Sequence, residues 1–325
     1  MNALARIVRA TVATLALVAA THAAAQAWPT KPIRLVVPFP PGGAVDFYAR
    51  VVQQPLSEVL GQTVVIDNKA GASGMVGAEA VAKAPPDGYT LLLGNIASLA
   101  INVGIYPKMP YDPLKDFTPI VRTVDVNYVL VVHPSVPVKS VPELIAYAKA
   151  NPGKLSYGSA GSGSLPHLGT ELFKAQTGTD MVHVPYKGGG PMVTDLLGGS
   201  VQVVIGDQAN LMPHVQSGKL RALAVATPKR SPNAPDLPTI AETGLAGYDA
   251  TAWQGLVGPA GMPPDVVKRL NEAFNKVMAM PAVREKLVGG GLEPVGGTPE
   301  QFGRFIGSEI AKWTKIAKDV GAKAE

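Results

Sequence analysis

Short apolar stretches alternate with amphipathic stretches along most of the chain, the order typical of repeated β/α units. The first apolar run, residues 33–39, predicts a strand, and residues 46–60 predict a helix that ends at Gly61. Because the strand runs are apolar throughout, they suit a largely parallel sheet that is buried on both faces by helices. The pattern therefore predicts an α/β fold.

The same criteria place the other elements. Further strands are predicted at residues 63–68, 89–95, 127–138, 154–159, 181–186, 201–207, 219–227 and 253–259. Further helices are predicted at residues 74–83, 141–150, 165–176, 191–197, 211–217, 264–280, 282–288 and 299–320. A Pro-rich passage at residues 106–119 interrupts the pattern, and we expect it to wrap over the surface.

These elements form two β/α series, followed by a long C-terminal part that can return to the first series. We therefore expect two lobes joined by two crossings of the chain, near residues 125–131 and 222–227. In this scheme the first lobe takes residues 28–127 and 226–325, and the second lobe takes residues 128–225. Small ligands commonly bind between such lobes.

The first 27 residues have the pattern of an export signal. Arg6 and Arg9 form the positive region, residues 10–20 form a short apolar core, and small residues predict cleavage after Ala25 or Ala27. The alternative is a membrane anchor, but the apolar run is shorter than the roughly 20 residues that span a bilayer. The sequence therefore predicts an exported protein.

Composition narrows the function classes. Of the 325 residues, 46% are hydrophobic and 16% charged, which permits a substantial core. Loss of Arg6 and Arg9 with the signal lowers the net charge from +5 to +3, too mild to indicate nucleic-acid binding. The absence of cysteine excludes disulfides, thiolate metal sites and cysteine nucleophiles.

Polar or glycine-rich loops follow six of the predicted strands, where ligands of open α/β sheets bind. They are residues 40–46, 70–74, 94–95, 159–164, 186–190 and 206–208. In the first loop, Gly42 and Gly43 let a ligand approach the main chain, next to the unpaired N–H groups at a helix start. This predicts a carboxylate site, although Asp46 could occupy those donors as a cap. A purely structural turn is the alternative.

The loop at residues 159–164 is the counterpart in the second lobe. Ser164 is a natural N-cap, and Ser159 or Ser162 could donate a hydroxyl to a carboxylate, with Gly161 and Gly163 between them. The serines could instead only satisfy the loop and the helix end. His167 could face the ligand or be an ordinary packed or surface histidine.

Four other side chains near strand ends are candidates with a structural alternative each. Asp207 could meet a ligand or cap the next helix, and Asn95 could bind a ligand or close a turn. Tyr186 could offer a hydroxyl or an apolar wall, or belong to an ordinary turn. Trp253 fits the core better than a ligand wall.

Motifs for catalysis and cofactors are missing from the sequence. His133, His183 and His214 have no metal-ligand spacing, and no P-loop, G-x-S-x-G or H-E-x-x-H sequence occurs. We therefore expect no metal, no cofactor and no catalytic residue.

Seven ordered motifs, spread over nearly all of the predicted mature chain, resemble the tripartite tricarboxylate transporter substrate-binding proteins, also called the Bug or TctC family. They are "WPTKPIRLVVPFPPGGAVDFYAR", "VVIDNKAGASGMVGAEAVAKAPPDGYTLLLGN", "YPKMPYDPLKDFTPI", "ANPGKLSYGSAGSGSLPHL", "VHVPYKGGGPMVTDLLGG", "SGKLRALAVATPKRSPNAPDLPTIAETGL" and "GGTPEQF". The resemblance implies a two-lobed periplasmic binding protein of the type II, or Venus-flytrap, kind. Each lobe would be a mostly parallel sheet flanked by helices.

The resemblance also implies a site in which main-chain amides of the first loop hold a carboxylate, partly through ordered water. The residues that match this loop are Phe39, Gly42, Gly43, Ala44 and Val45. Residues 159–164 with His167 match the second-lobe loop, and Asp207 matches an acid that meets polar groups of the ligand. The chain departs from the common family pattern at Ala44-Val45, at Leu165-Pro166 and around Gly206-Asp207-Gln208, which leaves the ligand's side group open.

The sequence supports a monomeric receptor that captures a small carboxylate and delivers it to the permease subunits of a tripartite transporter. A second hypothesis is a ligand-sensing module that signals to a membrane histidine kinase, since both would use the same clamp. A hydrolase or lyase is a third, for which the missing motifs leave little support.

Overall fold

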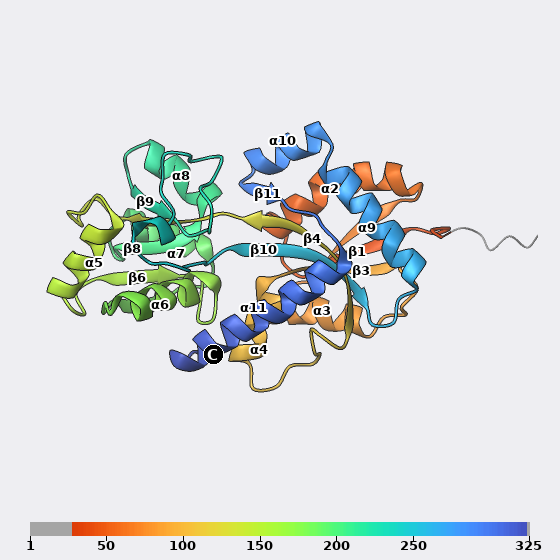
Figure 1. Cartoon of the computed structure of the whole chain (residues 1–325), viewed down its shortest axis with the longest axis horizontal. Coiled ribbons are helices and arrows are strands. Elements are labelled where there is room, and N and C mark those ends of the chain that lie inside the picture. Colours follow the sequence, from red (N-terminus) through yellow and green to blue (C-terminus); the bar gives the residue numbers. More distant parts are fainter. Residues whose placement is uncertain (1–27, 324–325) are drawn as a thin grey trace, which may run out of the picture.

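The computed structural model of the protein describes residues 28–323, so the predicted signal peptide at residues 1–27 lies outside the described part. Two sheets with helices packed around them form two lobes, and the long strands β4 (Phe117–Val126) and β10 (Ala252–Pro259) of one sheet reach the junction between the lobes (Figure 1). The predicted two-lobed α/β fold is confirmed, but the sheets are mixed rather than mostly parallel, because each contains both parallel and antiparallel strand pairs.

Sheet A has the strand order β11-β4-β10-β3-β1-β2, and sheet B has the order β7-β6-β8-β5-β9. The strands of sheet A are β1 (Ile33–Val37), β2 (Val64–Asn68), β3 (Thr90–Asn95), β4 (Phe117–Val126), β10 (Ala252–Pro259) and β11 (Leu292–Pro294). The strands of sheet B are β5 (Tyr128–Val132), β6 (Ser156–Ser159), β7 (Val182–Pro185), β8 (Val203–Asp207) and β9 (Arg221–Val225).

The helices around sheet A are α2 (Ala44–Leu60), α3 (Met75–Ala82), α4 (Asn102–Ile105), α9 (Pro264–Met278), α10 (Pro281–Gly289) and α11 (Pro299–Asp319). Those around sheet B are α5 (Val141–Ala150), α6 (Leu165–Thr177), α7 (Gly189–Leu197) and α8 (Gln208–Gln216). Short helical turns occupy Ala72–Gly74, Ala97–Ile101 and Ala241–Thr243. None of the helices within residues 28–323 is both long and apolar enough to cross a membrane.

Strand direction brings the carboxyl ends of both sheets to the junction of the lobes. β4 and β5 are separated only by Asn127, and β10 pairs antiparallel with both β3 and β4, so β1, β3 and β4 all run toward that residue. In sheet B, β8 runs antiparallel to β5 and ends with Asp207 opposite Tyr128. The loops that follow β1, β3, β6 and β8 therefore lie at the junction, as binding between lobes requires.

Helix α2 shows how the sequence builds this architecture. Its buried positions repeat at helical spacing from Val45 to Leu60, and Gly61 ends the helix with a left-handed φ of 72°. The helix begins at Ala44 rather than at the predicted Asp46, because the extended Gly43 is the N-cap residue.

The chain returns to sheet A later than predicted. After β9, Val225 bridges Thr239, the Ala250 N–H donates to the Ala226 carbonyl, and the Tyr248 hydroxyl donates to the Gly169 carbonyl. This segment therefore stays beside sheet B. The second crossing lies near residue 251 and not at residues 222–227.

Strand β4 is absent from the sequence prediction, which treated its start as part of a surface passage. Pro119 within β4 lies opposite Val257 at a register shift, where the ladder tolerates a residue that lacks an N–H. Strand β11 has only three residues, and the helical turns at residues 97–105 follow β3 without a side-chain cap. These elements carried no pattern that could be recognised.

Candidate functional site

The first candidate loop connects β1 to α2 and is held by Asp46. The Gly42 N–H donates to Asp46 Oδ2 at 2.9 Å, and Asn68 Nδ2 donates to Oδ1 at 2.9 Å. Arg50 donates to both oxygens, from Nε at 2.8 Å and from Nη2 at 3.1 Å. All four acceptor positions of the carboxylate are thus used within the protein. Asp46 orients the loop and does not cap α2, whose N-cap residue is Gly43, while its contact with a ligand stays a prediction.

Asp46 is also charged under ordinary conditions. The hydrogen bonds from Arg50 lower the pKa of Asp46 to about 2, against the opposing effect of burial, and those from Gly42 and Asn68 lower it further. The side chain is 2% exposed, so the charge is compensated within the loop.

The second candidate loop connects β6 to α6 and repeats the arrangement. The Gly163 N–H donates to His167 Nδ1 at 3.0 Å, four residues along the chain, as Gly42 does to Asp46. In both loops the donor is a glycine with positive φ, 94° at Gly42 and 75° at Gly163. In both, the acceptor is the third residue of the helix. We call residues 42–46 and 163–167 the twin helix starts.

The twin helix starts leave the first turns of α2 and α6 without a side-chain cap. Gly43 has no side chain, and the Ser164 hydroxyl donates backward to the Gly161 carbonyl at 2.7 Å. Because the first N–H groups of a helix have no intrahelical partner and carry a partial positive charge, both starts can hold an anion. Pro166 removes one donor from the second start.

The space around the two starts differs. A Cβ atom at Gly42 or Gly43 would meet no atom within 4 Å, so a ligand can approach the main chain there. A Cβ atom at Gly163 would instead overlap Ile105 of α4, in the other lobe. The second start therefore lies in contact with lobe I.

His167 belongs to a stack of rings under the second loop. Its ring lies 4.0 Å from that of His183 at an angle of 3°, and His183 lies 4.9 Å from Tyr157. Ser159 is fully buried, and its hydroxyl contacts His183 Nε2 at 2.7 Å. Burial lowers the pKa of His167, which suits a neutral ring whose Nδ1 accepts from Gly163. Ser159 and His167 thus support the loop, with Ser162 half-buried in it.

The remaining polar candidates are mainly engaged within the protein. The Ser98 N–H donates to Asn95 Oδ1 at 3.1 Å, which closes the turn after β3, and the Tyr186 hydroxyl donates to Asp195 at 2.7 Å. The Ala209 N–H donates to Asp207 Oδ1 at 2.9 Å, so Asp207 caps α8. Burial raises the pKa of Asp207. For these residues the structural alternative accounts for the contacts that the structure shows.

Phe39 is half-buried within lobe I. Its ring lies against Gly74 at the start of α3, and its carbonyl accepts from Asn68 Nδ2 at 3.2 Å. Asn68 and Arg50, the two partners that hold Asp46, were missed by sequence reasoning. The spacing of Asp46 and Arg50 by four residues on one helix was a readable signal for that pair.

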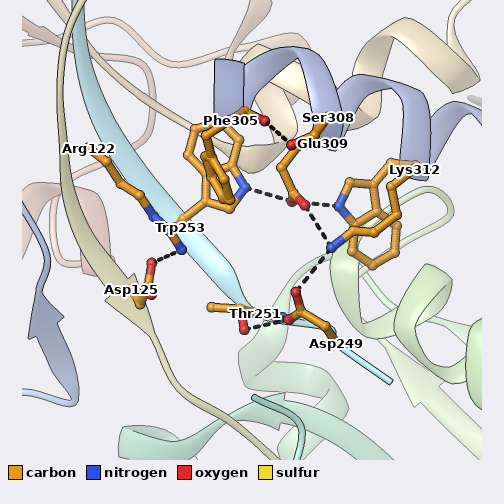
Figure 2. Close-up of polar contacts among 10 residues, drawn as sticks. Arg122, Asp125, Asp249, Thr251, Trp253, Phe305, Ser308, Glu309 and Lys312 are labelled. Atoms are coloured by element: carbon orange, nitrogen blue, oxygen red, sulfur yellow. Dashed lines mark hydrogen bonds and ion pairs between the residues drawn. The ribbon is translucent and has the colours of Figure 1, made fainter. Parts of the chain in front are cut away.

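Trp253 lies in the core, as the sequence favoured, and belongs to a polar cluster behind the junction (Figure 2). The Trp253 and Trp313 indole N–H groups both donate to Glu309 Oε2 at 2.9 Å. Lys312 lies 2.7 Å from Glu309 Oε1 and 3.4 Å from Asp249 Oδ2. Helix α11 is thereby tied to the segment that leads back from sheet B.

A pocket beside this cluster contains a second charged pair. Arg122 pairs with Asp125 near the end of β4 (Figure 2). Asp249 and Glu293 line the same pocket. Burial raises the pKa of Asp125 to about 6, with smaller contributions from those two acids, while Arg122 opposes the rise. Within the described part of the chain, no three His, Asp or Glu side chains are grouped so that they could hold a metal ion.

Comparison with known proteins matches residues 48–322 to the family model described as "Tripartite tricarboxylate transporter family receptor". Protein BugT of Bordetella pertussis is 41% identical over 305 residues, which cover 94% of this chain and 94% of BugT.

Two solved structures are similar over most of their length. Rpa4515 of R. palustris with adipate is 43% identical with a TM-score of 0.81, covering 91% of this chain and 99% of that one. MatC (Rpa3494) from Rhodopseudomonas palustris with bound malate is 32% identical with a TM-score of 0.76. The match covers 89% of this chain and 99% of MatC.

Proposed function

Because the chain belongs to the tripartite tricarboxylate transporter receptor family, we propose that it captures a small carboxylate between its lobes and delivers it to a transporter's membrane permease. The protein would act outside the cytoplasm after removal of residues 1–27, as a monomer without cofactor or catalysis. Hinge motion of the two lobes about Asn127 and residue 251 would bury the ligand and present the closed form to the permease.

The twin helix starts carry this proposal. Each lobe contributes one helix whose first turn has no side-chain cap and whose preceding loop is fixed by a bond from glycine to the third helical residue. Such a fixed loop needs little further ordering when an anion binds. The Gly42 N–H is already used by Asp46, so the donors in lobe I are those of Gly43, Ala44 and Val45.

The magnitudes are sufficient for micromolar binding. A hydrogen bond to a charged group contributes about 1.5–3 kcal/mol, so four such bonds offer roughly 6–12 kcal/mol. Micromolar affinity requires about 8 kcal/mol, before the loss of translational and rotational freedom is counted. Main-chain donors at the two helix starts can therefore hold a carboxylate without an arginine.

The similar structures support the choice of ligand class. Rpa4515 is described with adipate and MatC with malate, and both of these ligands are dicarboxylates. We propose that this chain binds a ligand of the same class, with residues 159–164 and Asp207 closing the site from lobe II.

Replacing Ala44, the first residue of α2, by proline tests the proposed anion site. Proline is favoured at this position of a helix but removes one donor, whereas Ala44→Ser keeps the N–H. We expect Ala44→Pro to weaken binding of adipate or malate at least tenfold in titration calorimetry, and Ala44→Ser to change it less than threefold. Equal binding by both variants would contradict the site, and wild-type protein that binds no carboxylate would contradict the function.

A further inference from the structure

Two buried glutamines have amide groups that no other part of the protein satisfies. Gln208 is 2% exposed and Gln254 is 1% exposed, and neither the Nε2 nor the Oε1 of either residue has a hydrogen-bond partner. Among residues 28–323 no other buried side-chain amide leaves both its nitrogen and its oxygen without a partner. Such groups are rare in folded proteins because burying them unpaired costs free energy.

Both glutamines lie at the junction of the lobes. Gln254 on β10 pairs with Asn95, the last residue of β3, so their side chains lie on the same face of sheet A. Gln208 follows Asp207 directly, and its N–H donates to the Asn127 carbonyl at 2.9 Å, at the crossing between β4 and β5. One unsatisfied amide therefore comes from the carboxyl edge of each sheet, on either side of the first crossing.

In Gln202, by contrast, both polar atoms of the side-chain amide have hydrogen-bond partners. Its Oε1 accepts from the Ser156 N–H at 2.9 Å, and its Nε2 donates to the Gly199 carbonyl at 2.7 Å. The amides of Gln208 and Gln254 can each donate two hydrogen bonds and accept others, which matches the polar end of a ligand placed between the lobes.

We propose that Gln208 and Gln254 bind the second polar end of the ligand, so that the protein selects a dicarboxylate over a monocarboxylate of the same chain length. This inference rests on the proposed function, in which the helix starts hold the first carboxylate. Asp207 lies beside Gln208, its Oδ1 accepts from the Ala209 N–H, and burial raises its pKa against the effect of that hydrogen bond.

Titration calorimetry with adipate and hexanoate tests the proposal on wild-type protein and on Gln208→Leu and Gln254→Leu. We expect each variant to lose at least tenfold in the ratio of adipate to hexanoate affinity, because leucine cannot donate to a carboxylate. The melting temperature of the ligand-free variants should stay unchanged or rise, because an unpaired buried amide is replaced by an apolar group of similar size.

Gln202→Leu is the matched control. It should lower the melting temperature, because it breaks two hydrogen bonds, and leave the affinity ratio unchanged. An unchanged ratio in both Gln208→Leu and Gln254→Leu, with adipate still bound, would overturn this inference alone. A wild-type protein that binds neither adipate nor hexanoate would contradict the proposed function, and with it this inference.

Discussion

At the residue scale, the candidate site depends on the carboxylate of Asp46, which has two tasks: it orients a loop, and it remains charged. Asp46 meets both because Arg50, Asn68 and the Gly42 N–H supply every bond that it can accept. His167 fulfils the first task in the other lobe as a neutral ring. Two chemically different side chains thus fix two loops of the same shape.

Acid should weaken the protein through Asp46. Its pKa in the folded state is about 2, below the ordinary 3.8. The charged Asp46 therefore stabilises the folded state above pH 4, and this stabilisation is lost as the pH falls toward 2. We expect the loss to be about 1–2 kcal/mol, since the partner Arg50 is more than half exposed and screened by solvent. Urea unfolding between pH 2 and pH 7 measures it.

Asp46→Asn serves as the control for this pH dependence. The variant should be less stable than wild-type protein at pH 7, and the difference should shrink below pH 3. A difference that stays constant over the whole range would mean that the ion pair with Arg50 contributes nothing.

Sequence reasoning pointed to these loops but left open whether the polar side chains within them bind the ligand or serve the loop. Polar residues at strand ends, such as Ser159, Asn95 and Asp207, look like ligand contacts because ligands of open α/β sheets bind there. The structure shows a hydrogen bond within the protein for each of these three, and their contact with a ligand stays a prediction. Whether a hydroxyl or carboxylate turns inward or outward depends on local backbone geometry, which the order of residue types does not encode.

At the element scale, helix α11 links the core of lobe I to the segment that returns from sheet B. Glu309 on this helix is 5% exposed and accepts from two indole N–H groups, while Lys312 bridges Glu309 and Asp249 (Figure 2). The helix also packs against α6 of lobe II. Its amphipathic pattern was easy to recognise, whereas the role of its buried acid was not.

Replacing Glu309 by alanine should be strongly destabilising. Two buried indole N–H groups and Lys312 would lose their shared partner, which we expect to cost about 3–5 kcal/mol in the free energy of unfolding. Chemical denaturation measures the effect. Ser308→Ala removes an exposed hydroxyl that donates to the Phe305 carbonyl and should cost less than about 0.5 kcal/mol. Similar losses in both variants would show that the Glu309 contacts add little.

Most elements could be predicted because their apolar periodicity agrees with their burial, as α5 at Val141–Ala150 shows with both ends correct. Strand β4 could not be predicted, because Pro119, Arg122 and Asp125 interrupt its apolar pattern. Long-range pairing with β10, including the register shifts, holds those residues in the sheet. Tertiary contacts of this kind leave no trace in a short window of sequence.

At the scale of the whole molecule, the two lobes touch where Gly163 meets Ile105 and where Gly291 meets Ala209. The first contact joins the second helix start to α4 of lobe I, and the second joins the loop before β11 to the start of α8. Both contacts need a glycine because a side chain at that position would collide with the other lobe.

Gly163→Ala should therefore hinder the approach of the lobes. We expect it to weaken adipate binding at least tenfold and, in solution X-ray scattering, to leave a larger radius of gyration in the presence of adipate than wild-type protein shows. Ile105→Ala in the same chain should restore part of the affinity by making room for the new methyl group. If the double variant binds adipate no more tightly than Gly163→Ala does, the defect arises from backbone strain at φ 75° instead.

The absence of side-chain caps at both helix starts has a consequence for how such receptors diversify. A point mutation can delete a carboxylate or a guanidinium, but it cannot delete a peptide group unless it introduces proline. A carboxylate site made of main-chain amides is thus retained through almost any change in the surrounding side chains. Duplicated genes could then change their specificity for the rest of the ligand by exchanging neighbouring side chains, while binding of its carboxylate persists.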